Sequence, residues 1–353
     1  MGILLKFEER RISSWIAAIS PYGGIPLAFL VAAVIMQCSG IAPLAGFTSF
    51  FEGAVLNPTG LAVSLARSTA FLFMAVGIGL SFKANVLNIG AEGQYLMGAI
   101  AATAIAMVTQ DSLPLIISLA FCLLGAAAIG ALWASVAGYL RAYMGVNEII
   151  TTVMMNILAF KILQWLLRGP LKNPASQQWP MSPPLKTSIA ELVPGTTLNA
   201  GFILALLISI WTYFLLYRTV QGYKIRVVGS NPSAATYGGI NVRRTMVYAI
   251  MYSGALAGLA GAVDVLGVFH FLYEGISIGL GYTSVVVALI GKTDPLLIVP
   301  ASILFGITYN GFTYMQSALG VPYTLSKSVE GMIYLFILLI DVLTRYRIKV
   351  IVK

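Results

Sequence analysis

The sequence predicts an all-α, polytopic membrane helix bundle with about ten spans, two related halves and both termini in the cytoplasm. Of its 353 residues, 59% are hydrophobic and only 9% are charged, whereas soluble domains are about 45–50% apolar and about 25% charged. Apolar runs long enough to cross a bilayer, about 20 residues each, recur along most of the chain. We therefore expect residues 1–353 to form a single transmembrane domain with no separate soluble domain.

Apolar runs and their polar breaks define the predicted spans. The eighth run is short and rich in glycine, so we expect a half-helix or a re-entrant segment buried in protein. Before the first run, residues 1–24 mix acids and bases and predict an amphipathic helix at the membrane surface. The predicted spans are 26–48, 61–82, 88–109, 113–140, 147–168, 199–218, 245–269, 280–291, 296–317 and 329–345.

The basic residues set the predicted orientation. The formal net charge is +9, but Lys and Arg lie in the short connections between apolar runs, where they favour a topology signal over nucleic-acid binding. With a cytoplasmic N-terminus, fifteen of them fall in internal segments and four in external ones, while Arg67 and Lys161 fall within spans. We expect those two to pair with acids or to extend toward the membrane surface. The four external ones are Arg168, Lys172, Lys186 and Lys327.

Two connections are longer than the rest. The predicted external loop, 169–198, contains six prolines, which suits irregular and fairly rigid structure. The predicted cytoplasmic loop, 219–244, contains Ser230-Asn231-Pro232-Ser233-Ala234-Ala235-Thr236-Tyr237-Gly238-Gly239, with a capping residue, a proline at the first helical position and glycine at the end. This pattern predicts a two-turn helix; on local chemistry alone, an ordinary surface turn is an equal alternative.

The densest polar cluster within an apolar run opens the third predicted span, at Asn88-Ile89-Gly90-Ala91-Glu92-Gly93-Gln94. Ionisable and amide side chains are costly inside a membrane and are functional hypotheses by default. Asn88 and Glu92 are four residues apart, so on a helix they would share a face. We expect Asn88, Glu92 and Gln94 to line a solute path. The alternative is that Glu92 caps a helix or holds helices together.

A second polar stripe opens the fifth predicted span. Glu148, Thr152 and Asn156 follow Asn147 and recur every fourth residue, so one face of the helix is polar for about two turns. We expect this stripe to face the bundle interior or water, and we assign all four residues to the solute path.

Asp264 lies deep in the seventh predicted span and precedes the aromatic segment Phe269–Tyr273. A carboxylate beside aromatic rings suits a polar, planar solute, because rings stack and carboxylates accept hydrogen bonds. We therefore add Asp264 to the predicted path. For His270, the only histidine, an interfacial position is expected rather than a ligand role.

The sequence contains none of the catalytic motifs GxxxxGK[ST], HExxH or GxSxG. Cys38 and Cys122 lie apart in apolar runs without a CxxC pattern, so we expect them to be small buried apolar residues. We predict no enzyme activity, no metal site and no cofactor. If transport consumes ATP, another chain must supply the ATPase.

Three motifs together resemble the permease subunits of bacterial ABC importers of the ribose/branched-chain amino acid type: Asn88 to Gln94, Gly145-Val146-Asn147-Glu148, and Val228 to Ile240. The nucleoside-type permeases that work with a Bmp-like lipoprotein are the best match in that group. The glycine-rich stretches at 253–262 and 281–291 extend the resemblance over nearly the whole chain. Within it, the glycine-broken segments 88–98 and 279–291 suggest counterparts in two related halves.

The resemblance implies a permease of the bacterial cytoplasmic membrane that moves a nucleoside by alternating access. It implies these partners: a cytoplasmic ATPase, a second related permease, an external substrate-binding lipoprotein and a small-molecule substrate. The internal helix would be the coupling helix that docks on the ATPase. Its predicted contact residues are Gly229, Asn231, Pro232, Ala234, Ala235, Tyr237, Gly239 and Ile240.

Other functions remain open at this point. A simple sugar or a branched-chain amino acid would use the same kind of importer. A proton-coupled secondary transporter could use the same acids, and an integral-membrane enzyme is disfavoured because no nucleophile–base pair or metal cluster is evident.

Overall fold

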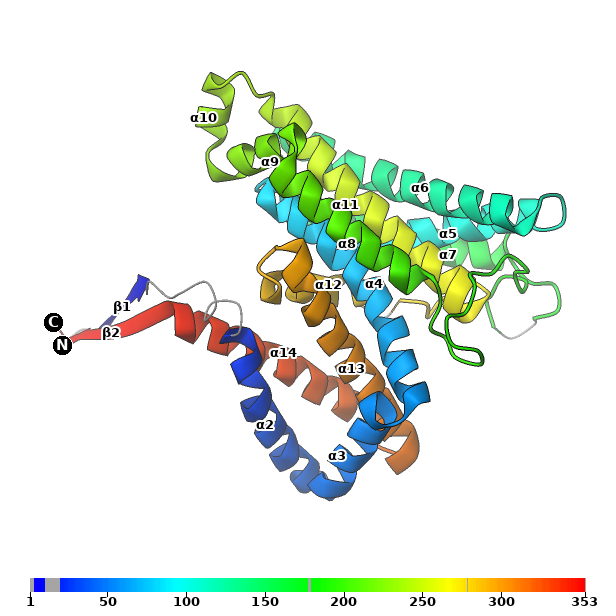
Figure 1. Ribbon diagram of the computed structural model, residues 1–353, viewed down its shortest axis with the longest axis horizontal. Coiled ribbons are helices and arrows are strands. Elements are labelled where there is room, and N and C mark those ends of the chain that lie inside the picture. Colours follow the sequence, from blue (N-terminus) through cyan, green and yellow to red (C-terminus); the bar gives the residue numbers. More distant parts are fainter. Residues whose placement is uncertain (1–2, 10–19, 177–178, 278, 353) are drawn as a thin grey trace. The chain divides into compact units, whose positions relative to one another are not determined.

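The computed structural model describes residues 3–9, 20–176, 179–277 and 279–352 (Figure 1). Over these residues the chain is nearly all-helical, with thirteen α-helices, α2 to α14, and one pair of β-strands. It divides into a central unit, Leu65–Gly306, and a terminal unit, which joins Met1–Ser64 to Ile307–Lys353. The boundaries between the units fall within α4 and α13.

Seven helices in the described part of the chain are long and apolar enough to span a membrane. They match seven of the ten predicted spans to within a few residues, because each apolar run ends at a Gly, Pro or polar cluster that also ends the helix. These helices are α4 (Pro58–Lys83), α5 (Ala91–Thr109), α6 (Leu115–Met144), α7 (Glu148–Arg168), α8 (Gly201–Arg218), α11 (Val242–Asp264) with its π-helical continuation η3 (Val265–Phe269), and α13 (Pro295–Leu319).

The predicted first span is wrong as a single helix. Residues 26–48 cover most of one helix and the start of another, α2 (Gly24–Cys38) and α3 (Pro43–Phe51). Gly40 between them has a φ of +79°, a left-handed conformation that ends a helix. Pro43 then takes the first position of α3, which it suits because it lacks an N–H.

The eighth predicted span is the short helix α12 (Leu280–Ile290), with 11 residues. At 1.5 Å per residue it is about 16 Å long, half of what a bilayer requires. This length agrees with the predicted half-helix. The tenth predicted span lies within α14 (Tyr323–Arg345).

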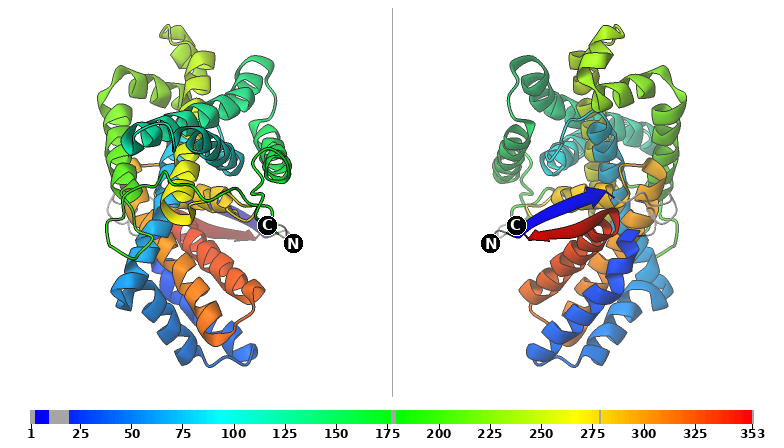
Figure 2. Two further views of the ribbon diagram at one scale, coloured as in Figure 1. Left: turned by 90° about the vertical axis from the view of Figure 1, so that its right-hand side faces the viewer. Right: turned by 90° about the vertical axis from the view of Figure 1, so that its left-hand side faces the viewer.

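Residues 3–9 form a strand, so the predicted N-terminal amphipathic helix is wrong there. Strand β1 (Ile3–Glu9) pairs antiparallel with β2 (Tyr346–Val352), in a register that joins Ile3 to Val352 (Figure 2). The C-terminal partner is a run rich in β-branched residues, which favours strand. Residues 1–2 and 10–19 of the predicted helix lie outside the described residues.

The terminal unit contains a polar cluster on α14. Lys327 Nζ lies 2.7 Å from Glu330 Oε2, and Tyr334 donates a hydrogen bond to Glu330 Oε1. Glu330 is buried. Lys327, which the sequence predicts on the external side, lies in α14 one turn after its start at Tyr323; its external position stays a prediction. Two short elements complete this unit, the 3-10 helix η1 (Ser20–Gly23) and the π-helix η2 (Glu52–Leu56).

Helices α5, α6 and α11 pack closely in the central unit because glycines lie where they cross. A Cβ atom on Gly98 would lie 2.3 Å from Gly258 Cα, and one on Gly258 would lie 2.2 Å from the Ala126 carbonyl oxygen. Small residues at helix crossings are a general means of association in membranes, where there is little hydrophobic drive between helices. These helices hold the first half of α5 fully inside the unit.

We predict that Gly258→Ala destabilises the protein by about 1–3 kcal/mol, because the new methyl group meets backbone rather than a flexible side chain. Gly331→Ala is the matched control, since a Cβ on Gly331 meets nothing within 4 Å. Thermal unfolding of both variants in detergent, followed by size-exclusion chromatography, measures the effect. Equal unfolding temperatures would contradict the proposed tight crossing.

Candidate functional site

Two helix starts meet in the central unit. Helix α5 begins at Ala91 after a non-helical segment, and α12 begins at Leu280. A Cβ on Gly281 would lie 2.2 Å from the backbone nitrogen of Glu92, so only glycine allows the two backbones to come this close. We call this contact the α5–α12 junction. The two glycine-broken segments that the sequence suggested as counterparts are thus adjacent.

The carboxylate of Glu92 binds the start of α12. It accepts hydrogen bonds from Ser277 Oγ at 2.7 Å, from Gly279 N at 3.1 Å and from Gly281 N at 2.7 Å. Gly279 is the N-cap of α12, so Glu92 satisfies amides that a helix leaves unpaired at its start. The positive end of the helix dipole also favours the carboxylate. The structure therefore agrees with the alternative reading of Glu92 as a cap.

Asn88 does not share a helical face with Glu92, and that prediction is wrong. Asn88 lies before α5, because Gly90 rather than Asn88 is the N-cap. Its side chain is buried, donates to Gln94 Oε1 and Ser253 Oγ at 2.8 Å each, and accepts from Gly90 N at 2.9 Å. Asn88 and Gln94 therefore link the segment before α5 to α11.

The predicted polar stripe on α7 is buried and faces the same junction. Asn156 Oδ1 accepts from Gly93 N at 2.8 Å, and its Nδ2 donates to the Ile89 carbonyl at 3.0 Å and to the Tyr282 hydroxyl at 3.1 Å. One Asn thus contacts the segment before α5, the first turn of α5, and α12. The prediction that the stripe faces the bundle interior is confirmed.

The start of α7 carries the other predicted residues. Asn147 is the N-cap and accepts from Ile149 N at 2.9 Å. Glu148 Oε2 lies 3.2 Å from Arg141 Nε, and Thr152 Oγ donates to the Glu148 carbonyl. Glu148 and Thr152 are buried, whereas the Arg141 side chain is one-third exposed. These residues join α7 to the end of α6.

Asp264 lies at the far end of α11 from the coupling segment. Its Oδ2 accepts a hydrogen bond of 2.7 Å from Tyr95, one helical turn beyond Ala91. Both side chains are buried. Asp264 is therefore held by α5 and is not open to a solute in this conformation.

The two basic residues within predicted spans contact neighbouring side chains. Arg67 of α4 lies over the ring of Phe269, 5.4 Å from its centroid. Lys161 donates to Gln164 rather than to an acid, at 3.2 Å.

The predicted two-turn helix is present as α10 (Pro232–Tyr237). Asn231 caps it by accepting from Ala234 N at 3.0 Å, and Pro232 occupies its first position. Gly239 follows with a φ of +76°, which ends the helix as the sequence predicts. A second helix, α9 (Val220–Ser230), precedes it within the segment predicted as a cytoplasmic loop.

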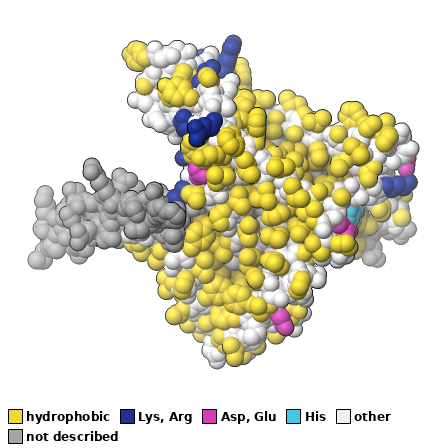
Figure 3. All heavy atoms as spheres, in the orientation of Figure 1, with side chains coloured by type: hydrophobic (Ala, Val, Ile, Leu, Met, Phe, Trp, Pro, Cys, Tyr) yellow, Lys and Arg dark blue, Asp and Glu magenta, His cyan; other side chains and the backbone are white. Residues whose placement is uncertain are grey.

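The coupling residues separate into buried and exposed sets. Ala235 is fully buried, whereas Tyr237 is 94% exposed. Gly229 lies against the end of α4, since a Cβ there would be 2.0 Å from the Lys83 carbonyl oxygen. Lys and Arg side chains gather around α9 and α10 (Figure 3). They include Arg141, Lys224, Arg243 and Arg244, which line two small cavities beside α10 and Ile240.

At the other end of α8 and α11, the long loop 169–199 is tied to η3 and to the residue that follows it. Leu185 N and Ile189 N donate to the carbonyls of His270 and Leu266 at 2.8 and 3.0 Å. His270 itself has a φ of +59° and ends η3. The proline-rich loop is therefore held by backbone hydrogen bonds, apart from residues 177–178, which lie outside the described residues.

Three contributors were missed in the sequence: Tyr95, Ser253 and Ser277. Each bonds a predicted residue, namely Asp264, Asn88 and Glu92. Only Tyr95 had a local signal, because it directly follows the polar motif. Ser253 and Ser277 are each more than 160 residues away in sequence from the motif residue that they bond. Among the described residues, no group of three His, Cys, Asp or Glu side chains is placed to bind a metal.

The family model described as "Branched-chain amino acid transport system / permease component" matches residues 60–340. The chain belongs to this family. It is therefore a multi-pass membrane permease of the ABC type. The resemblance seen in the sequence is confirmed, as is the prediction that this chain is a permease component and not the catalytic subunit. Membership also implies association with a separate ATPase subunit and a substrate-binding protein.

Three relatives extend over nearly the whole permease. It is 29% identical to the glucose ABC transporter permease protein TsgB13 of Haloferax volcanii, over 99% of this chain and 95% of that protein. It is 30% identical to the guanosine ABC transporter permease protein NupP of Bacillus subtilis, over 90% and 92%. It is 29% identical to the nucleoside ABC transporter permease protein NupB of Lactococcus lactis, over 90% and 89%.

We predict that Glu92→Gln weakens the α5–α12 junction. An amide has one acceptor oxygen in place of two, so at least one buried donor loses its partner, at a cost of about 1–3 kcal/mol. Hydrogen–deuterium exchange of the peptide that spans residues 276–284 should become faster and the unfolding temperature should fall. Glu52→Gln is the control, since Glu52 is exposed in η2. Unchanged exchange in Glu92→Gln would rule out the capping role.

Proposed function

We propose that this permease forms the translocation path of an ATP-driven importer for a nucleoside and works by alternating access. The observation that carries the proposal is its similarity, at 29–30% identity over about nine tenths of each chain, to permeases named for guanosine and for nucleosides. The capped helix α10, beside a basic surface, supports an importer driven by a cytoplasmic ATPase.

A sugar is the second candidate cargo. The relative that covers 99% of this chain is named for glucose, so the same permease architecture serves a solute without a base. The branched-chain amino acid, after which the family is named, is a third. A proton-coupled secondary transporter is less well supported, because membership of an ABC permease family gives the transport cycle another energy source.

The coupling route runs from α10 to the α5–α12 junction. We propose that Gly229, Asn231, Pro232, Ala234, Ala235, Tyr237, Gly239 and Ile240 form the ATPase-docking segment. Gly229 touches the Lys83 carbonyl, and the chain from Lys83 leads within a few residues to Asn88 and Gly90. A shift of α10 on ATP binding would therefore be passed to the start of α5 through this short segment.

We propose that the solute path passes the α5–α12 junction. Its walls in the open states would come from Asn88, Glu92, Gln94, Asn147, Glu148, Thr152, Asn156 and Asp264. In the described conformation these groups bond one another, backbone groups and other side chains such as Arg141, Ser253 and Tyr95, so the path opens only when the junction separates. A buried polar group in a membrane needs a hydrogen-bond partner. When the junction separates, water or the solute would replace the present protein partners of these groups.

The assembly completes the proposal. Residues 1–353 would act as one permease domain with its N- and C-termini in the cytoplasm, residues 219–244 inside and 169–198 outside. One chain supplies one coupling segment, so two permeases are needed; we propose a heterodimer with a related second permease in a bacterial cytoplasmic membrane. An external lipoprotein would deliver the solute.

Uptake of radiolabelled guanosine, glucose and leucine by cells with and without the gene tests the cargo. Loss of ATP-dependent guanosine uptake in the deletion strain is the expected result. Unlabelled competitors and an ATP-depletion control separate this importer from other carriers. Normal guanosine uptake with lost glucose uptake would replace the cargo by a sugar.

We predict that Gly239→Val lowers uptake about tenfold or more while the protein remains inserted. Valine is strained at a φ of +76°, at a cost of about 1–3 kcal/mol, and displaces the end of α10. Gly40→Val is the matched control, since Gly40 has a φ of +79° and, like Gly239, no atom near its Cβ position. Normal uptake by Gly239→Val would remove α10 as the coupling element.

We predict that Glu148→Gln lowers uptake at least about threefold, because a hydrogen bond to a charged group contributes about 1.5–3 kcal/mol and less where one partner, here Arg141, is partly exposed. It weakens the pair with Arg141 at the start of α7. Glu52→Gln, on an exposed residue, is expected to transport normally. Equal uptake by the two variants would mean that the α7 stripe has no part in transport.

A further inference from the structure

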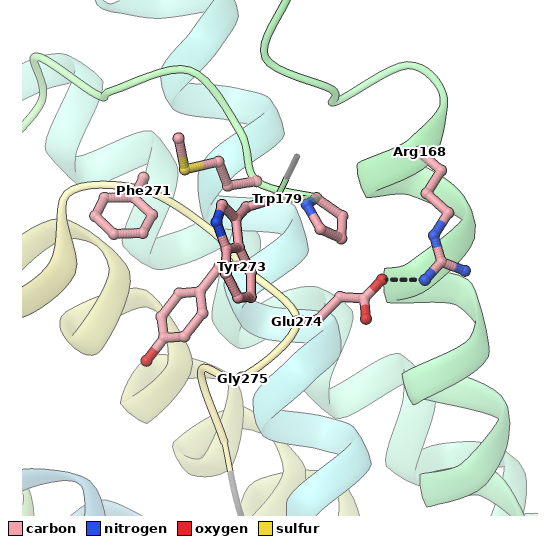
Figure 4. A pocket seen from close by; sticks show the side chains of 8 residues that line it. Arg168, Trp179, Phe271, Tyr273, Glu274 and Gly275 are labelled. Carbon is pink, nitrogen blue, oxygen red and sulfur yellow. Dashed lines mark ion pairs between the residues drawn. The ribbon is translucent and has the colours of Figure 1, made fainter. Parts of the chain in front are cut away.

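A cavity of about 610 Å³ lies at the end of α7 in the central unit (Figure 4). Its volume falls within the range of about 300–1,000 Å³ that small-molecule sites occupy. None of the eight predicted path residues lines it. Its walls are Arg168, Trp179, Pro180, Met181, Phe271, Tyr273, Glu274 and Gly275.

Aromatic rings and a single ion pair line the cavity. The rings of Phe271 and Tyr273 lie 5.5 Å apart between centroids, and Trp179 adds a third ring that is 74% exposed. Arg168 lies 2.8 Å from Glu274 on the side of the cavity formed by α7. Figure 4 shows the rings of Phe271 and Tyr273 on one side and the ion pair on the other.

The backbone fixes these walls. Met181 pairs with Tyr273 in an antiparallel bridge, Ser182 N donates to the Leu272 carbonyl at 2.8 Å, and Leu272 N donates to Ser182 Oγ at 2.9 Å. The Trp179 side of the cavity is thereby tied to the Phe271–Gly275 side. Such a pre-formed cavity loses little entropy when it binds a ligand.

A short chain segment links the wall of the cavity to the α5–α12 junction. Ser277, two residues beyond Gly275, donates to Glu92, and the Ile276 carbonyl accepts from Tyr95 at 3.5 Å. On α7, Gln164 donates to Glu274 at 3.3 Å, two turns beyond Asn156. A ligand in the cavity would therefore lie one short segment away from the capped start of α12.

We propose that this cavity is a binding site for a planar heteroaromatic base at the outer entrance of the path, where the solute waits before the junction opens. The inference rests on the proposed function for the side of the membrane that the cavity faces and for the choice of a nucleoside as the solute. The base would stack on Trp179 or Tyr273, since every base has a π-face and stacking on aromatic rings contributes about 1–3 kcal/mol per base. The guanidinium of Arg168, with five N–H donors, and the carboxylate of Glu274 would bond its edge.

The lining favours a base over a free sugar. Both stack on aromatic rings, but a sugar carries hydroxyl groups around its whole edge, and each buried hydroxyl needs a partner. The polar groups of the lining side chains are the Arg168–Glu274 ion pair, the Trp179 indole N–H and the Tyr273 hydroxyl, while Pro180, Met181 and Phe271 contribute carbon and sulfur. A flat base presents two apolar faces to such walls and one polar edge to the ion pair.

Photolabelling with 8-azidoadenosine tests the site directly. The permease, purified from membranes with its co-purifying subunits, is irradiated with the probe and the labelled peptides are identified by mass spectrometry. Label is expected on peptides that contain Trp179 or Tyr273, protected by excess guanosine and not by excess ribose. Trp179→Ala should reduce the protected label about tenfold, and Trp179→Phe, which keeps a ring, should retain most of it.

Trp211→Ala is the matched control, because Trp211 is likewise exposed, at 61%, and lies on α8 outside the cavity. Label confined to other peptides, or equal protection by ribose, would overturn the base-binding site. Guanosine uptake by the same strain is scored separately. Uptake without labelling of the cavity would refute this inference alone, whereas labelling of the cavity without uptake would support the site and refute the proposed transport of nucleosides.

Discussion

The carboxylate of Glu92 holds together the two helix starts on which the central unit depends. Three donors at the start of α12 bond to it, and Gly281 lets the α12 backbone lie against Glu92 itself. A half-helix inside a membrane leaves its first amides without water, so a fixed acceptor must satisfy them. Around this contact, Asn88 binds the segment before α5 to α11. Asn156 and Tyr95 bind the first turns of α5 to α7 and to the end of α11.

The junction lies between two different ends of the central unit. One end carries α9, α10 and a concentration of Lys and Arg side chains, as expected for a cytoplasmic surface. The other carries the tied loop and the aromatic cavity. The segment from Lys83 to Gly90 links the first end to the junction, and the segment from Gly275 to Gly279 links it to the second. Short covalent connections on both sides therefore join the junction to each end of the unit.

The sequence predicted elements whose signals are local. Seven long spans, the short α12 and the capped α10 all have a clear composition or capping pattern, and the burial of Asn156 and Glu148 follows from their four-residue spacing. The failures are nonlocal or depend on one backbone angle. Gly40 splits an apolar run that hydropathy predicts as continuous, and β1 needs a partner some 340 residues away. Asn88 lies outside α5, where its side chain bonds the distant Ser253 as well as Gln94. No periodicity reveals that Ser277 reaches Glu92.

A double-mutant cycle on Glu92 and Ser277 tests the central claim most directly. The free energy of unfolding would be measured in mixed detergent–SDS micelles for wild type, Glu92→Gln, Ser277→Ala and the double variant. Because the two side chains share a hydrogen bond of 2.7 Å, we predict a coupling energy of at least about 1 kcal/mol, so that each substitution costs less by that amount once the other is made. Effects that add to within about 0.3 kcal/mol, together with a cost below about 1 kcal/mol for Glu92→Gln alone, would show that Glu92 does not hold the start of α12.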